Sequence, residues 1–457
     1  MSTKEVYIRP WFWQEIENTD KKYAHIIMIA TKPDIIKQAP LYLELKSRWE
    51  LVILVHTWQH YNYNLSEWVL KEFWMQVDVN LNIYWPIHKK FSLIVERLGD
   101  FLVRLNEEFK KIPIPYVHWD TLTAATADKA AFLNKFAVVH VEAWIRTFTP
   151  KKEFFEKVFQ DYEKWTLDLD WYYQELQKRE NYELWSIEPY PEQFDTRSIE
   201  WSTWFFAVPV ENYRQTLINE GYDPNKMQVV WNTVVDAIAE SKKKIKQSKA
   251  FEIYPNMKWK DFIFVTIHRR ENCEKKERFL VLYNALKKLI QQWVNVCWLE
   301  LYASWYAIDK YWLRDDLNNL IKNYPENFAY GKALAHHHEV IDMITKASAV
   351  VTDSGSMQEE ATVVWTRCVT LRFGSDRIET VWAWYNLIAP PINSNLVTDI
   401  ILYAIENIDK KNIRNLYWEN VSKKIVDWVI KLLEKQWQLF QFDDERLWLD
   451  KYFNWRI

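Results

Sequence analysis

The chain has 457 residues, of which 49% are hydrophobic and 26% charged, a composition typical of a globular protein with more than one core. A net charge of -3 argues against a nucleic-acid-binding surface. Cys273, Cys297 and Cys368 form no Cys-x-x-Cys pair, which argues against disulfides and zinc. Residues 1–20 lack a signal-peptide pattern and no apolar run reaches the roughly 20 residues that cross a bilayer, so we expect a cytoplasmic protein.

The numbers of tryptophan and glycine are both abnormal. There are 28 tryptophans and 5 glycines, and together they make up about 7% of the chain, the usual share of glycine alone. Some bacterial lineages read the UGA codon as glycine and others read it as tryptophan. We therefore hypothesise that most of these tryptophans are glycines in the natural protein; the alternative is a chain truly rich in tryptophan.

Apolar strands alternate with helices in the first part of the chain. Residues 24–45 predict a buried strand, a Thr-Lys-Pro-Asp turn and a helix, because Pro33 suits the first turn of a helix. Residues 50–57 and 112–121 predict two more strands, and an alanine-rich helix then leads to a fourth strand that ends near Glu142. Continuous apolar strands separated by helices indicate a parallel, doubly wound sheet.

A second α/β set is expected in the other half of the chain. Residues 149–188 are charged and helix-patterned, and we interpret them as a helical insertion over the first domain. A hinge near 231–245 precedes the new strands, and the tail at 411–457 reads as an amphipathic helix. The expected strands lie in DFIFVTIH (261–268), NVCWLEL (295–301), ASAVVTDSG (347–355) and RCVTLRFG (367–374). The expected parts are an N-terminal domain (1–235), a C-terminal domain (236–425) and a helical tail (426–457).

The stretch VVTDSGSMQEEATVV (350–364) is the most informative one. A strand ends at Thr352, the residues from Asp353 to Ser356 form a turn, and a helix follows. Such a turn aims backbone N–H groups and a helix dipole at an anion, most naturally a phosphate. Glu360 lies one turn into the helix, where a carboxylate can accept ribose hydroxyls. A purely structural strand-turn-helix explains the stretch equally well.

Basic side chains follow two other strands. His268 and Arg269 come just after a strand end in VTIHRREN (265–272), where they can bind a diphosphate. Arg377 follows a further strand, again at the edge of an open sheet where ligands bind. A solvated run of charges is the commoner meaning of an Arg-Arg-Glu sequence.

Three carboxylates, Asp120, Glu142 and Glu192, are candidate acid/base groups from the first half of the chain. The first two follow strands, and all three could converge, although each taken alone is more often structural. The three consecutive histidines in AHHHEV (335–340) point about 100° apart on a helix, so they predict no metal site. No GxGxxG motif appears, so a tightly held dinucleotide is not indicated.

Together these motifs resemble the non-hydrolysing UDP-N-acetylglucosamine 2-epimerases, from about residue 24 to 430 apart from the 149–188 insertion. Eight segments match in order: TKPD (31–34), WQH (58–60), WDT (119–121), HVEAWIR (140–146), PEQ (191–193), WNT (231–233), HRREN (268–272) and DSGSMQEE (353–360). Trp58, Trp119, Trp144 and Trp231 stand where the family has glycine, which allows φ > 0 and close approach of a ligand. We expect an indole at these turns to be incompatible with a positive φ and to obstruct the approach of the ligand.

The resemblance implies an α/β fold with two Rossmann-like doubly wound domains facing a cleft (GT-B-like). It implies interconversion of UDP-GlcNAc and UDP-ManNAc by elimination and re-addition of UDP, without cofactor or metal, by a homodimer serving cell-envelope polysaccharide biosynthesis. The implied catalytic residues are Asp120, Glu142, Glu192 and His268. The implied substrate-binding residues are Lys32, Lys37, Arg269, Ser354, Gly355, Glu360 and Arg377. Gln59 and His60, with Arg269, match a region where some members bind a second, activating substrate molecule.

Four departures from the family pattern are not tryptophan for glycine. Lys32 replaces arginine, Gln193 replaces an acid, and Ile267 and Ser356 replace glycines, which leaves the substituents of the sugar open. Three other functions stay open at this point. They are a hydrolysing 2-epimerase that releases UDP and ManNAc, a GT-B glycosyltransferase, and an inactive nucleotide-sugar-binding relative.

Overall fold

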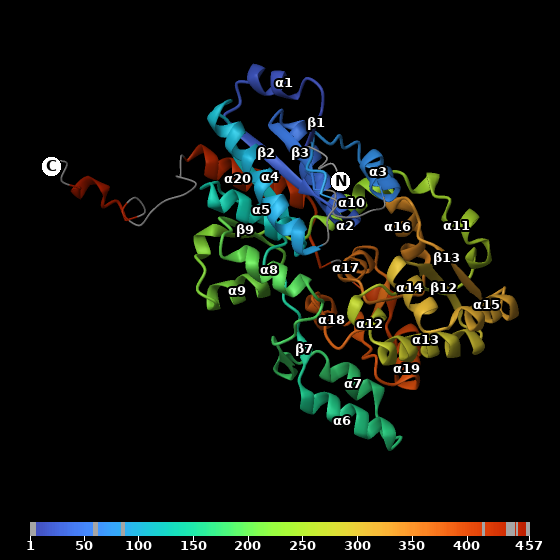
Figure 1. Ribbon diagram of the computed structural model, residues 1–457. Helices are drawn as coiled ribbons and strands as arrows, with labels where there is room; N and C mark the ends of the chain where they lie inside the picture. The colour runs from blue at the N-terminus through green and yellow to red at the C-terminus, as the bar shows by residue number, and fades with distance from the viewer. Residues whose placement is uncertain are drawn as a thin grey trace. The chain divides into compact units, whose positions relative to one another are not determined.

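The computed structural model describes residues 6–57, 63–83, 87–413, 416–435, 444 and 447–453, and Figure 1 labels its helices and strands. The chain divides into two compact units. Unit 1 contains Met1–Trp144, Asp195–Thr233 and Asn420–Ile457, and unit 2 contains Ile145–Phe194 and Val234–Glu419. The chain therefore passes between the units more than once before it ends.

Unit 1 is built on an eight-stranded sheet in the order β1-β4-β3-β2-β5-β6-β9-β10. Every neighbouring pair is parallel except β1 and β4. The strand order reverses between β2 and β5, because β3 and β4 lie on one side of β2 and all later strands lie on the other. The strands are β1 (Tyr7–Ile8), β2 (Tyr23–Ile29), β3 (Leu51–His56), β4 (Val79–Asn80), β5 (Ile112–His118), β6 (Val139–Val141), β9 (Phe205–Val208) and β10 (Met227–Val229).

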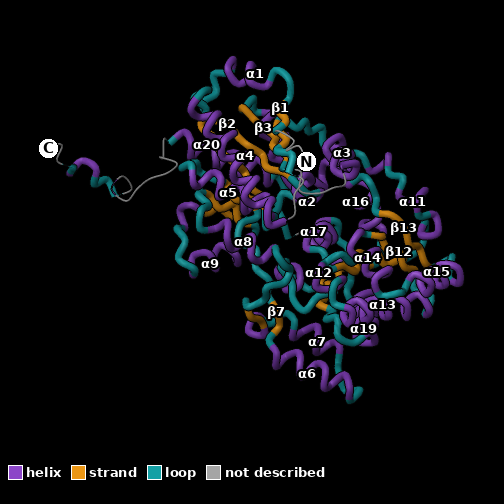
Figure 2. Tube along the Cα trace, in the orientation of Figure 1, coloured by secondary structure: helices purple, strands orange, loops and turns teal. Residues whose placement is uncertain are grey.

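The helices of unit 1 pack on this sheet and bury its apolar strands (Figure 2). Helix α2 begins where the sequence predicts it, because Thr31 and Asp34 form a capping box around the Pro33 turn. Helix α20 packs on α2, where Arg48 lies 2.6 Å from the carboxylate of Asp427. The helices are α1 (Phe12–Asn18), α2 (Lys32–Ser47), α3 (Tyr63–Glu72), α4 (Ile87–Glu107), α5 (Leu122–Leu133), α9 (Glu211–Asn219) and α20 (Val421–Glu434), with α8 (Glu192–Glu200) at the boundary with unit 2.

Unit 2 has a six-stranded, fully parallel sheet in the order β13-β12-β11-β14-β15-β16. This is the doubly wound order of a Rossmann fold, and it reverses between β11 and β14. The strands are β11 (Phe262–Thr266), β12 (Asn295–Glu300), β13 (Phe328–Lys332), β14 (Ala349–Thr352), β15 (Arg367–Thr370) and β16 (Asn386–Ile388). The helices are α10 (Val234–Lys242), α11 (Ala250–Ile253), α12 (Arg270–Cys273), α13 (Lys276–Gln291), α14 (Tyr302–Lys310), α15 (Arg314–Asn323), α16 (His337–Lys346), α17 (Gly355–Val363), α18 (Ile378–Trp382) and α19 (Ser394–Asn407).

The helical insertion belongs to unit 2 rather than to the first domain, where the sequence analysis placed it. Helices α6 (Lys152–Glu163) and α7 (Leu169–Glu175) lie side by side (Figures 1 and 2), and the ring of Phe154 stacks on that of Tyr172. The Tyr162 hydroxyl donates to Asp399 at 2.7 Å, and the Tyr172 hydroxyl donates to the Ile388 carbonyl at 2.6 Å. The short strands β7 (Thr149–Pro150) and β8 (Tyr182–Glu183) pair at the base of the insertion. These aromatic contacts could not be read from the charge pattern.

The predicted pair of doubly wound α/β sheets is confirmed, with all eight strands expected from the sequence at the expected positions. The sequence does not predict the other six strands of the two sheets, which are β1, β4, β9, β10, β13 and β16. Within the described ranges, no helix is long and apolar enough to cross a membrane.

Candidate functional site

The candidate residues of unit 1 follow the strands at the point where the strand order reverses. Ligands of open parallel sheets bind at the carboxyl ends of strands beside such a point. Helix α2, which follows β2, carries Asp34 and Lys37 three residues apart and so on one face. His118 ends β5, and Glu142 directly follows β6. The fold therefore gathers these four side chains, which we call the Glu142 cluster.

The Glu142 carboxylate lies between a lysine and a histidine. Lys37 donates from Nζ to Glu142 Oε2 at 2.8 Å, and His118 Nε2 lies 3.1 Å from Glu142 Oε1. On its other side, His118 Nδ1 lies 3.4 Å from Asp34 Oδ1. All four side chains are buried. A carboxylate in this position can exchange a proton while the lysine compensates its charge.

The neighbouring carboxylates of Glu142 and Asp34 change the pKa of His118. Burial lowers the pKa of His118, but the charge of Glu142 and the contact with Asp34 outweigh burial and raise the pKa above its usual value. The charged form is thus favoured in the folded protein. No motif match pointed to His118, although it directly precedes the WDT segment.

We expect His118 to make folding stability depend on pH. Its folded pKa is raised, so its contribution is present below the unfolded pKa of about 6.5 and is lost as the pH rises through the folded pKa. The loss of stability in His118→Asn should therefore be larger at pH 5.5 than at pH 9 in urea unfolding.

His25 provides the matched control for this prediction. It is also buried, but burial lowers its pKa to about 4. Protonation of His25 at low pH therefore opposes folding, so the benefit of keeping His25 should shrink as the pH falls from 7 to 5. The same trend in His118→Asn and His25→Asn would contradict the assignment.

The residues that follow β5 and β6 adopt unusual backbone conformations. Trp119 and Trp144, and Glu142 itself, all have φ near +60°. The Lys37 ammonium lies 5.1 Å from the centre of the Trp119 ring, and Asp120, the next residue, is buried. The two loops thus hold Asp120 and Glu142 in the interior of unit 1.

The Trp144 indole does not clash as expected. It is fully buried, its ring lies 5.8 Å from that of Tyr213, and its N–H donates to Glu220 at 2.8 Å. The side chain thus finds space and a polar partner within unit 1. The left-handed backbone that favours glycine is nevertheless present at Trp119, Trp144 and Trp231.

In unit 2, Asp353 organises the loop that carries His268. Its carboxylate accepts hydrogen bonds from the backbone N–H groups of His268 (3.0 Å) and Arg269 (3.0 Å) and from Asn272 Nδ2 (3.1 Å). His268 Nδ1 lies 3.1 Å from the same carboxylate. Burial raises the pKa of Asp353, but His268 and these donors outweigh burial and lower the pKa below its usual value. Because Nδ1 faces Asp353, Nε2 of the partly exposed ring can face an anionic ligand.

Glu192 and Arg269 form an ion pair within unit 2. The sequence predicts Glu192 in the first domain with Asp120 and Glu142, whereas Glu192 belongs to the segment that packs with unit 2. Arg269, expected to contact substrate, is buried against this acid. The pair fixes the orientation of both side chains next to His268.

Arg377 is fully buried in an ion-pair network. Its guanidinium pairs with Glu359 and lies 3.6 Å from Asp376, which accepts a hydrogen bond from Arg372 at 2.7 Å. Burial raises the pKa of Asp376, but the two arginines outweigh burial and hold it below its usual range. A Cβ on Gly355 would lie 3.0 Å from Asp376, so glycine allows the first turn of α17 to approach the network. We expected Arg377 to face the ligand, but these contacts favour a supporting role.

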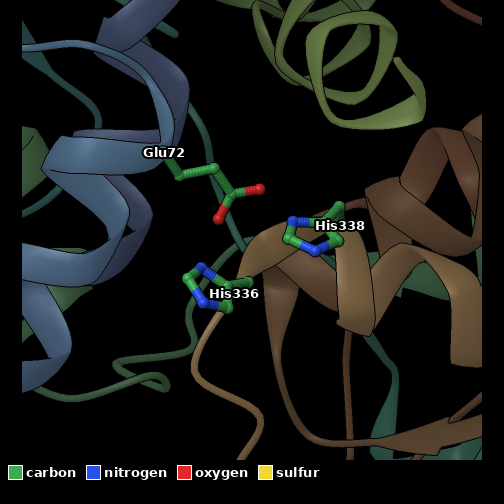
Figure 3. A group of neighbouring side chains, drawn as sticks. All are labelled: Glu72, His336 and His338. Atoms are coloured by element: carbon green, nitrogen blue, oxygen red, sulfur yellow. The ribbon is translucent and has the colours of Figure 1, made fainter. Parts of the chain in front are cut away.

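The side chains of the three consecutive histidines, 336–338, point in two directions. His336 and His338 stack with ring centroids 5.1 Å apart (Figure 3). His337 lies buried, with Nδ1 2.7 Å from Ser241 Oγ and Nε2 3.3 Å from Glu360 Oε1. His337 therefore supports Glu360, the proposed ribose-binding carboxylate.

The remaining candidates lie at helix starts or outside the described residues. Lys32 is the first residue of α2 and is partly exposed, and Ser354 is the residue before α17. The α17 N-terminus follows β14 next to the reversal point of the sheet, where a phosphate would be favoured. Gln59 and His60 lie outside the described residues, as does Trp58.

Known proteins are similar to this chain in sequence and in fold. A family model described as UDP-N-acetylglucosamine 2-epimerase matches residues 43–160 and 186–430, and the break falls within the insertion. The UDP-N-acetylglucosamine 2-epimerase of Neisseria meningitidis is 27% identical over 425 residues, covering 89% of this chain and 99% of the relative. That of Methanocaldococcus jannaschii is 25% identical over 397 residues, covering 84% and 93%. The crystal structure of the latter protein in complex with UDP-GlcNAc and UDP has a TM-score of 0.72 at 22% identity, covering 90% of this chain and 99% of that chain.

Proposed function

The chain belongs to the UDP-N-acetylglucosamine 2-epimerase family, and from this we propose that it interconverts UDP-GlcNAc and UDP-ManNAc without net hydrolysis. The observation that carries the proposal is Glu142, a buried carboxylate between Lys37 and His118 at the carboxyl ends of the sheet in unit 1. Unit 2 supports it with His268 and the turn before α17, both beside the reversal point of its sheet.

The proposed reaction proceeds through an unsaturated sugar. A carboxylate base removes the C2 proton, the C–H electron pair forms the C1=C2 double bond, and UDP leaves with the electron pair of the C1–O bond. UDP then adds back to C1 while C2 receives a proton on the opposite face. Two acid/base groups are required, and we assign them to Asp120 and Glu142 with Glu192 as a third carboxylate.

The departing diphosphate needs cationic and hydrogen-bonding groups. We assign this role to His268 Nε2, with Nδ1 held by Asp353, and to the N–H groups at the start of α17. Glu360, held by His337, is assigned to the ribose hydroxyls. Lys32 and Lys37 are assigned to the nucleotide sugar, and Arg377 to the support of this loop. We also propose that the protein is a cytoplasmic homodimer whose product is used in cell-envelope polysaccharide synthesis. Light scattering of the purified protein tests whether it is a dimer.

The test is NMR of the chain with UDP-GlcNAc in D2O. We expect UDP-ManNAc to appear and deuterium to enter C2 of both sugars, because the proton is exchanged with solvent between removal and return. Release of UDP with free ManNAc would contradict the non-hydrolysing outcome. An unchanged sugar without deuterium would contradict the epimerase proposal altogether.

A further inference from the structure

We propose that thirteen of the tryptophans are glycines in the protein made by the source organism, encoded by UGA codons that this organism reads as glycine. They share a left-handed backbone: Trp11, Trp49, Trp74, Trp119, Trp144, Trp165, Trp231, Trp259, Trp293, Trp312, Trp365, Trp384 and Trp448. Composition alone could not assign particular positions. The backbone conformation does, and it does so whatever reaction the chain catalyses.

The conformation itself is the first line of support. These tryptophans have φ between 51° and 76°, a region that is strained for any bulky side chain. In the described ranges only five residues of all other non-glycine types have positive φ: Asn82, Lys110, Lys135, Glu142 and Asn420. Tryptophan has no intrinsic preference for this region, whereas glycine enters it freely.

Helix ends give the second line of support. After α2, the N–H of Trp49 donates to the Lys46 carbonyl (3.0 Å) and the N–H of Glu50 donates to the Leu45 carbonyl (3.2 Å). This pair of bonds is the Schellman motif, whose left-handed residue is usually glycine. Five further tryptophans occupy the same position after helices: Trp74, Trp165, Trp293, Trp312 and Trp365.

A genuine glycine shows the same arrangement. Gly221, after α9, has φ 94°, and its N–H donates to the Ile218 carbonyl while that of Tyr222 donates to Leu217. Gly221 and the six tryptophans therefore serve one structural purpose. At three of these sites the side chain lies almost wholly in solvent, since the indoles of Trp49, Trp165 and Trp312 are 86%, 91% and 89% exposed. Tryptophan is normally well buried, so such exposure is unexpected for a real indole.

Other tryptophans behave as tryptophans do. Trp13, in helix α1, stacks on Phe109 with centroids 4.8 Å apart and lies beneath the Arg104 guanidinium at 4.2 Å. Trp298, in strand β12, is 1% exposed and packs edge-on against Tyr330. Neither has positive φ. Backbone conformation therefore distinguishes Trp13 and Trp298 from the thirteen, although two of the thirteen, Trp119 and Trp144, also have buried side chains with partners.

The gene sequence and the native protein give the direct test. We expect UGA codons at the thirteen positions and UGG at Trp13 and Trp298, together with glycine masses for the matching peptides of the protein purified from its own cells. UGG codons at the thirteen positions, or indole-containing peptides there, would overturn the proposal.

Recombinant protein gives an independent test. A gene with glycine at all thirteen positions should yield a protein whose thermal midpoint exceeds that of the tryptophan form by more than about 10 °C, because relief of strain at each site adds a few degrees. In the control, Trp13→Gly and Trp298→Gly should each lower the midpoint. An unchanged or lower midpoint for the thirteen-glycine protein would overturn this proposal even if the NMR assay shows epimerase activity. Conversely, a raised midpoint in a protein that lacks epimerase activity would contradict only the proposed function.

Discussion

Glu142→Gln is expected to lower kcat by about 10²–10⁴-fold, the usual contribution of a group that transfers a proton in the transition state. Glutamine keeps the shape of the side chain but cannot take up a proton, and it leaves the buried Lys37 ammonium without its counter-charge. Breaking a buried ion pair from one side costs about 3–5 kcal/mol of folding stability. We expect both losses in the same variant, measured by initial rates and by urea unfolding.

The loss of rate and the loss of folding stability in Glu142→Gln can be separated with a second substitution, Lys37→Met. In the double variant Lys37→Met/Glu142→Gln neither partner is charged, so most of the lost stability should return while the rate stays low. Recovery of activity in the double variant would show that Glu142 acts only through the charge of Lys37. Full activity of Glu142→Gln alone would remove Glu142 from the reaction.

Asp353→Asn is expected to destabilise unit 2 by about 3–5 kcal/mol and to reduce kcat/KM by at least about 10²-fold. The carboxylate accepts three N–H donors, and an amide would turn one of its own donors toward them. The imidazole of His268 would also lose the contact that directs Nδ1 inward. Steady-state kinetics and urea unfolding at pH 7 measure the two effects.

The pH dependence of the folding stability of Asp353→Asn identifies the cause of its destabilisation. The folded pKa of Asp353 is lowered, so its contribution is present above the unfolded pKa of about 3.9 and disappears as the pH falls through the folded pKa. The difference between wild type and Asp353→Asn should therefore shrink below about pH 4. Asp315→Asn, which changes an exposed carboxylate on α15, should show no such loss at pH 7. A pH-independent difference would point to a packing defect instead.

Local signals in the sequence predicted the backbone of the site well. The capping residues Thr31 and Asp34 fix the start of α2, and the apolar run before Asp353 ends where β14 ends. These features depend on neighbours within a few residues, so they can be read without a fold. The parallel order of the strands follows from the same apolar runs.

Side-chain partners were less predictable, because they come from distant segments. Arg377 and His268 both follow strands, yet only the fold shows that Glu359 binds the first and Asp353 orients the second. Glu192 looked like part of the first domain until the packing of Tyr172 tied its segment to unit 2. His118 drew no attention, because its role depends on two carboxylates from other elements.

Helix α20 places a constraint on how the chain is made. It completes unit 1 against α2, with Leu433 accepting a hydrogen bond from Tyr23 and the Trp428 ring packed edge-on against Phe205. On the ribosome, the continuous segment of unit 2 from Val234 to Glu419 emerges before α20 does. The β2–α2 layer of unit 1 therefore stays uncovered until α20 has been synthesised, after the whole of that segment of unit 2. In nascent chains, unit 2 should therefore become resistant to protease before unit 1, whereas N-terminal domains usually fold first.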